Sequence, residues 1–250
     1  MCTFHFKNHP NIAFKYNYLD GNFYDFLFTL ESVVELFGKY FTNMSDKQLT
    51  ISLQKTSPAP MCIRQANLIY LNTEYNLYAQ AAYQFSHELC HFMIPKDVTA
   101  ELRWFEESIC QLASIFFLVE LCDYWKKHSI NIYTNDGKLY ADAFFDYAIK
   151  DAAGETMINI HNPKEFQSLI LDCEQRAKNK YIANLLLPVF QKYPLTWHAI
   201  PYLCNVTFNP NSSQINAFHK ALEQWIEISP CESHIGLEAI QNIFFPQESC

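Results

Sequence analysis

Residues 77–93 read LYAQAAYQFSHELCHFM, and this stretch predicts one long helix. Four apolar side chains recur at helical spacing and form a single stripe: Ala82, Phe85, Leu89 and Phe92. Such a stripe anchors a helix in the core of a protein. Pro95 lacks the backbone N–H that a further turn would need, so the predicted helix ends near Met93.

The opposite face of this helix carries the motif H-E-x-x-H, formed by His87, Glu88 and His91. Histidines four residues apart project one turn apart from the same side of a helix. Both imidazoles can therefore reach one zinc ion at about 2.0–2.1 Å. A carboxylate beside the first ligand can take a proton from metal-bound water and pass it to a leaving amine. The motif predicts a hydrolytic zinc centre, although a pattern this short also arises by chance on helices that bind no metal.

A catalytic zinc usually has three protein ligands, and two stretches can supply the third. Asp97 lies six residues after His91, as in the pattern H-E-x-x-H-x-x-G-x-x-H/D, but Ile94 stands where that pattern has glycine. A β-branched residue resists the sharp turn that glycine permits. Glu106 and Glu107 lie near the start of a second predicted helix, at 100–127. The pattern favours this acidic pair over Asp97.

A helical hairpin would return the second helix to the first and bring a carboxylate to both histidines. Gln111 and Ser114 continue the face of Glu107 and supply polar groups suited to surround a metal. The apolar face is formed by four residues: Phe105, Ile109, Leu112 and Phe116. This periodicity favours Glu107 and leaves Glu106 as an alternative.

Residues 68–117 resemble the gluzincin branch of the zincin metallopeptidases, in which a glutamate on the next helix completes an HExxH zinc site. The run W-F-E-E-S at 104–108 looks like the W-x-x-E-G segment of that branch, with Ser108 in place of its glycine. By that register Glu107 is the ligand. The gap after His91 is shorter than in the best-known gluzincins, which keeps Glu106 open as the ligand.

The resemblance implies a zinc-dependent peptidase that binds Zn²⁺ through His87, His91 and Glu107 and uses Glu88 as the general base. It implies a peptide or protein substrate. Residues 68–71 then form either a strand that pairs with extended substrate or an ordinary internal strand. A non-catalytic zincin-like protein, whose metal site serves structure, binding or sensing, is the second hypothesis.

The remainder of the chain predicts an α+β fold. Alternating aromatic residues near the N-terminus predict a strand pair: Phe4, Phe6, Phe14, Tyr16 and Tyr18. A helix is expected at 22–41 and extended structure at 49–72. Further helices are expected near 138–152, 163–191, 213–228 and 235–244. We therefore expect a zincin-like mixed lobe over 1–130 and a helical lobe over 131–250 that closes the cleft.

Composition limits the classes of partner. Eighteen basic against 26 acidic residues give a formal net charge of −8, which argues against a broad nucleic-acid surface. No stretch has the length and apolarity of a membrane helix, and the first residues do not resemble a secretory signal. Nine scattered cysteines without C-x-x-C spacing fit reduced thiols, so we expect a cytoplasmic protein, with non-classical export left open.

Hydrolysis at such a centre also needs a donor that stabilises the oxyanion. Tyr83 lies one turn before His87 on the same helix face, so it can line the cleft or simply hold the helix. Other tyrosines and histidines are possible donors, and nothing in the sequence ranks them: Tyr124, His128, His161 and His198.

Overall fold

The structure is a computed structural model that describes residues 2–16, 22–41, 44–54, 59–152, 157–209 and 212–246. Contacts divide the chain into two compact units, Met1–Met93 with Ala113–Ala153 and Ile94–Leu112 with Gly154–Cys250. The expected lobes 1–130 and 131–250 stay a prediction. Among the described residues, no helix is both long and apolar enough to cross a lipid bilayer.

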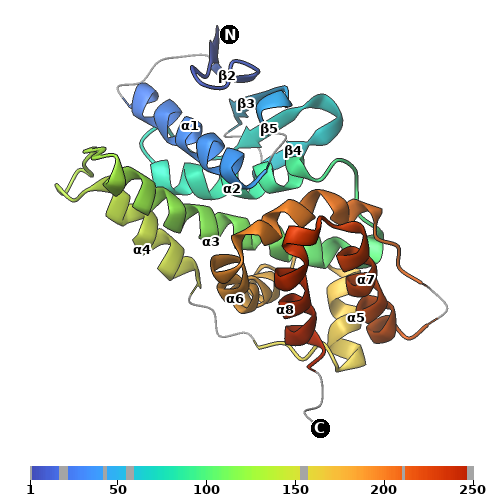
Figure 1. The fold of residues 1–250 in the computed structure, drawn as a ribbon. Helices are drawn as coiled ribbons and strands as arrows, with labels where there is room; N and C mark the ends of the chain where they lie inside the picture. The colour runs from blue at the N-terminus through green and yellow to red at the C-terminus, as the bar shows by residue number, and fades with distance from the viewer. Residues whose placement is uncertain are drawn as a thin grey trace. The chain divides into compact units, whose positions relative to one another are not determined.

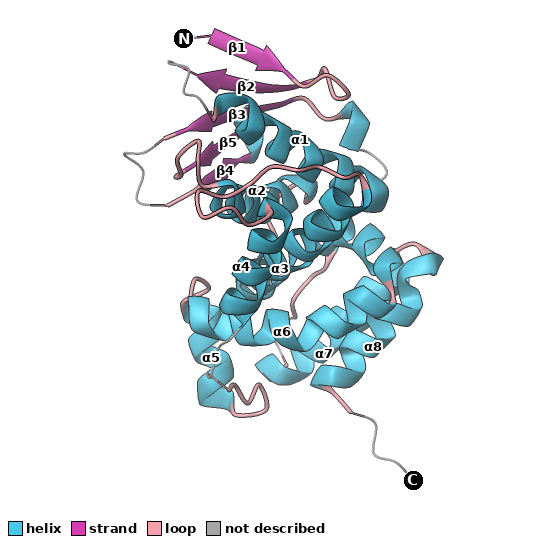
Figure 2. Ribbon diagram, turned by 90° about the vertical axis from the view of Figure 1, so that its left-hand side faces the viewer, coloured by secondary structure: helices cyan, strands magenta, loops and turns pink. Residues whose placement is uncertain are grey.

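The first unit contains a five-stranded mixed sheet (Figure 2). Its strands are β1 (Cys2–His5), β2 (Ile12–Tyr16), β3 (Leu49–Leu53), β4 (Met61–Ile63) and β5 (Leu68–Leu71), in the order β1-β2-β3-β5-β4. The three central strands are parallel, and β1 and β4 run antiparallel to their neighbours. The predicted N-terminal strand pair is confirmed for β1 and β2, while Tyr18 lies outside the described residues.

The strand β5 is internal, and β4 forms the edge of the sheet beside it. Ile69 of β5 pairs with Ile51 of β3 on one side and with Cys62 of β4 on the other. Of the two interpretations of residues 68–71, the internal strand is therefore the correct one. Both β4 and β5 contact the helix α2 (Tyr78–Met93), so the sheet edge lies against this helix.

Four helices belong wholly or mostly to the first unit (Figure 1): α1 (Phe23–Tyr40), α2, α3 (Arg103–Lys127) and α4 (Tyr140–Ala152). The predicted apolar stripe of α1 is confirmed, because all five of its members are fully buried: Phe26, Leu30, Val33, Val34 and Phe37. Phe37 stacks on Phe117 of α3 with ring centroids 3.9 Å apart. The hydroxyl of Tyr40 donates to Glu120 at 2.7 Å, which adds a polar link between α1 and α3.

The helix α3 begins three residues later than expected. Residues 100–102 form a separate 3-10 turn, Ala100–Leu102, and regular α-helix starts at Arg103. Helix ends often tighten in this way because their terminal backbone groups lack partners four residues away. The α2 helix agrees with its prediction to within one residue, since its spacing and the proline after it are local signals.

The second unit is helical in its described residues (Figure 1). Its elements after α3 are α5 (Pro163–Leu171), α6 (Arg176–Lys192), a long 3-10 helix η4 (Pro194–Asn205), α7 (Gln214–Ile228), a short 3-10 turn (Cys231–Ser233) and α8 (His234–Phe244). The helices near 213–228 and 235–244 are confirmed to within one residue. The 3-10 helix η4, which contains two prolines, was not anticipated.

The expected single helix at 163–191 is wrong, because the chain breaks between α5 and α6. Asp172 adopts an extended conformation, and its carboxylate accepts a bond from the backbone of Glu174. The side-chain amide of Gln175 donates to the carbonyls of Ser168 and Asp172. Side chains that bond the backbone in this way offer it an alternative to the helical ladder, so they end α5.

Aromatic side chains anchor the first turns of α3 in the second unit. Trp104 and Phe105 are fully buried. The ring of Trp104 lies 5.6 Å from that of Phe166 and 5.1 Å from that of Phe218. Phe105 contacts Phe218 and Trp225 with centroids 5.5 and 5.8 Å apart. These contacts fix the rotation of α3 and thereby the direction in which its next residues point.

Gly236 of α8 tests how tightly the second unit is packed. A Cβ atom at this position would lie 1.8 Å from Oγ1 of Thr196, which is itself fully buried. Gly236→Ala is therefore expected to lower the free energy of unfolding by about 1–3 kcal/mol. Gly38→Ala in α1 is the matched control, because a Cβ there meets nothing within 4 Å and alanine favours helix by up to about 1 kcal/mol. Urea denaturation of both variants measures the difference, and equal stabilities would contradict the close contact.

Candidate metal centre

Two histidines project from one face of α2. The rings of His87 and His91 lie 5.0 Å apart between centroids, at an interplanar angle of 63°. Both side chains are half-buried, so they remain accessible to solvent. The opposite stripe is buried as predicted: Ala82, Phe85, Leu89 and Phe92. This separation of faces holds the helix in the core and leaves the imidazoles on an accessible side.

The helix α3 turns its Glu107 face toward α2. Ser114 lies two turns after Glu107, and its hydroxyl donates to the backbone carbonyl of Tyr83 at 3.1 Å. Tyr83 precedes His87 by one turn, whereas Ser114 follows Glu107. The two helices therefore run in opposite directions, and the register that joins Ser114 to Tyr83 brings Glu107 to the histidines.

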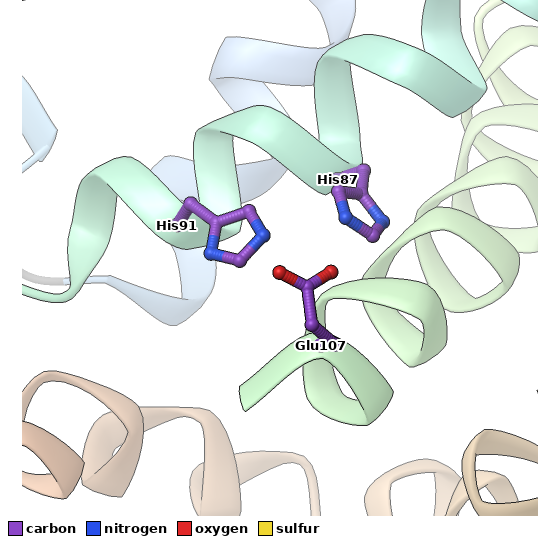
Figure 3. Close-up of side chains that lie close together, drawn as sticks. All are labelled: His87, His91 and Glu107. Atoms are coloured by element: carbon purple, nitrogen blue, oxygen red, sulfur yellow. The ribbon is translucent and has the colours of Figure 1, made fainter. Parts of the chain in front are cut away.

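The side chains of His87, His91 and Glu107 converge (Figure 3). One ligand atom from each residue lies within 4.8 Å of the other two. In the part of the chain that the structure describes, no other group of histidine, cysteine and acidic side chains gathers as closely. Two imidazoles and one carboxylate are a ligand set that suits zinc, with a fourth position left for water.

The three candidates for the acidic ligand lie in different surroundings. Glu107 is half-buried and joins the histidines, whereas Glu106 is only 5% exposed and does not belong to the group. Successive residues on a helix point about 100° apart, so the two glutamates cannot face α2 equally. Asp97 is exposed and also lies outside the group. Ile94 is fully buried and does not adopt the left-handed conformation that a glycine would permit there.

Glu88 follows the first histidine on α2 and is 5% exposed. Its position one residue from His87 places it on the flank of the histidine face. Its role as a general base stays a prediction.

Arg64 is a functional candidate that the sequence analysis missed. It directly follows the edge strand β4, and its Nε–H donates to the backbone carbonyl of His91 at 2.8 Å. Its Nη2 atom lies 3.4 Å from Nδ1 of the His91 ring. The only signal for this contact in the sequence is Pro95, four residues after His91. A proline has no N–H to donate to the His91 carbonyl, so a side chain can supply the donor instead.

Among the expected oxyanion donors, Tyr83 is the one that lies on α2, one turn before His87. It is half-buried, and its ring lies 5.5 Å from that of Tyr147 on α4. Tyr147 was not singled out from the sequence, because only the packing of α4 against α2 brings it there.

The other expected donors have different contacts. Tyr124 lies 17 residues beyond Glu107 on the same continuous helix, a separation of about 25 Å, and its hydroxyl donates to Glu35. His128 lies one turn further, and its Nδ1–H donates to the Tyr124 carbonyl at 2.8 Å. His161 packs edge-on against Phe245, and His198 contacts Glu232 at 3.2 Å. None of these four residues belongs to the candidate metal-binding group found in the described parts of the chain.

Comparisons of the chain with models of protein families, with curated proteins and with solved structures found no match.

The choice of acidic ligand gives a direct test. Glu107→Gln is expected to weaken zinc binding by more than about 100-fold, because the amide is a far poorer ligand than the carboxylate and outer partners of a site alone contribute about 10–100-fold. Glu106→Gln is the matched control and should change zinc affinity little. Competition with a chromophoric chelator measures both affinities. A larger loss in Glu106→Gln than in Glu107→Gln would contradict the assignment.

Proposed function

We propose that this chain is a zinc-dependent peptidase of the gluzincin type. The observation that carries the proposal is the convergence of two histidines, one turn apart on α2, with a glutamate of the following helix α3. The sequence resemblance and this geometry concern the same three residues: His87, His91 and Glu107.

The donor set supports zinc as the metal. Zinc–ligand bonds of about 2.0–2.2 Å put two ligands of a tetrahedral ion about 3.4 Å apart. The observed ligand atoms lie within 4.8 Å of one another, so small rotations of the side chains would close the group around one ion. Their partial exposure is consistent with a catalytic site, which needs an open position for water and substrate.

Each residue has a defined part in this proposal. His87, His91 and Glu107 would hold a zinc ion, which would supply Lewis-acid chemistry to water and to the substrate carbonyl. Glu88 would accept a proton from the attacking water and deliver it to the amine that leaves when the peptide bond breaks. Glu88 is buried on the same helix as the two histidines, so its carboxylate has little contact with bulk water.

The sheet edge supports a peptide as the substrate. Residues 68–71 were a candidate for pairing with an extended substrate, but they form an internal strand. The outer strand next to β5 is β4, which contacts α2, so we assign substrate pairing to β4. An extended peptide can add to such an edge through backbone hydrogen bonds. The side chains of β4 are half-buried or exposed, so the outer strand is accessible to a substrate strand. The net charge of −8 agrees with a protein or peptide partner rather than a nucleic acid.

Removal of the general base separates hydrolysis from metal binding. Glu88→Gln should keep its zinc content and lose at least about 100-fold in the rate of peptide cleavage, because general base catalysis contributes about 10²–10⁴-fold. A degenerate library of quenched fluorescent peptides is the probe, and zinc is measured in the same samples. Glu74→Gln, at an exposed position shortly before α2, is the matched control and should cleave normally.

The outcomes of this experiment discriminate between the two hypotheses for the site. Full activity of Glu88→Gln would contradict the mechanism. A wild-type protein that binds one equivalent of zinc and cleaves no member of the library would favour the non-catalytic role.

Metal binding should also stabilise the fold. Zinc at 100 times its dissociation constant is expected to add about 2.7 kcal/mol to the free energy of unfolding, because the ion binds the folded site. Thermal melts with zinc and with excess chelator measure the shift in Tm. His87→Ala should abolish the shift, whereas His128→Ala, just beyond the end of α3, should retain it. An equal shift in both variants would show that zinc binds elsewhere.

A further inference from the structure

Arg64 connects the edge of the sheet to the turn of α2 that carries His91. It begins the short 3-10 turn Arg64–Ala66 between β4 and β5, and it is half-buried. The turn closes at Asn67, which adopts a left-handed conformation with φ 49° and donates its N–H to the Arg64 carbonyl at 3.0 Å. The backbone of Arg64 is thus held at a defined place beside α2.

The first contact of the guanidinium satisfies a backbone group that the helix cannot. The carbonyl of His91 would normally accept from the N–H four residues later, and that residue is Pro95, which has none. The Nε–H of Arg64 donates to this carbonyl at 2.8 Å. A cation at the C-terminal end of a helix also interacts favourably with the helix dipole. This bond fixes the last turn of α2, on which His91 stands.

The second contact engages the ring of the same residue. Nη2 of Arg64 lies 3.4 Å from Nδ1 of His91. A guanidinium has only donors, so Nδ1 must offer its electron pair, and the neutral ring then carries its proton on Nε2. A ring in this state has no electron pair left on Nε2 for a metal. Histidines that bind metals usually show the opposite arrangement, in which the other ring nitrogen donates its N–H to a carboxylate or carbonyl.

We infer that Arg64 is a positioning residue that competes with the metal for His91, so that the metal binds only when the guanidinium releases the ring. The bond to the His91 carbonyl stays in place during this exchange and keeps the turn ordered in both states. Without metal, the guanidinium occupies the electron pair of the ring and keeps it from other partners. A divalent cation held by His91 would be repelled by the positive charge of the guanidinium, which would oppose metal binding. This inference rests on the zinc site proposed above.

Arg64→Met tests the competition, because methionine keeps an unbranched stem and removes the charge and all donors. The melting temperature of the metal-free protein is expected to fall by about 2–4 °C, since a helix carbonyl loses its partner. Zinc affinity, measured by chelator competition, is expected to rise about tenfold, within the range by which outer partners alter metal sites. A simple structural cap would lower both quantities together, so the opposite signs are the diagnostic result.

Nitrogen-15 spectra of the histidine side chains provide a second measurement that does not depend on activity. In the metal-free wild-type protein, His91 should carry its proton on Nε2, and Arg64→Met should lose that preference. Arg176→Met, at the exposed first residue of α6, is the matched control for the loss of one positive charge and should change neither zinc affinity nor the His91 signals.

The possible results separate this inference from the proposed function. Unchanged or weaker zinc binding by Arg64→Met would overturn the competition and leave the zinc site in place. A wild-type protein that binds no zinc would overturn both proposals. If Arg64→Met does not fold, Arg64→Lys replaces it. Lysine keeps the positive charge and can donate to one acceptor. It lacks the guanidinium fork that reaches both the carbonyl and the ring of His91, so zinc affinity should again rise.

Discussion

The register between α2 and α3 is the constraint on which the candidate metal centre depends. The bond from Ser114 to the Tyr83 carbonyl joins the two helices in opposite directions. Along this register Glu107 reaches the level of His87 and His91. A rotation of α3 by one residue would turn Glu106 toward α2 instead, about 100° away. The aromatic anchors Trp104 and Phe105 oppose such a rotation, because both rings are buried among other aromatic side chains.

The α2 helix has two different environments along its length, and both are needed. Its apolar stripe packs into the core of the first unit, and it contacts β4, β5 and α1. Its histidine face stays half-buried. A helix that was apolar all round would give no access to a metal, and a helix that was polar all round would have no fixed position. The position of the imidazoles is therefore set by side chains on the opposite face of the same helix.

Pro95 has consequences for both the end of α2 and the candidate site. It ends the helix, and it has no N–H that could donate to the carbonyl of His91 four residues earlier. Arg64 supplies that donor from a turn between two strands, 27 residues earlier in the chain. The same guanidinium approaches the His91 ring. A local feature of the sequence thus creates a requirement that a distant residue meets, and this links the sheet edge to a candidate ligand.

The sequence by itself determined α2, its two faces and the spacing of His87 and His91, because helical periodicity and a terminating proline act over a few residues. The α+β class and most helix ends followed for the same reason. Tertiary structure alone brings Glu107 rather than Glu106 to the two histidines, since that arrangement depends on the rotation of α3 in its aromatic environment. It also decided that β4 rather than β5 forms the sheet edge, because strand order arises from pairing between distant segments. Tertiary structure alone also brings Arg64 to His91, because no local pattern in the sequence relates residues that meet only when the sheet and the helix pack together.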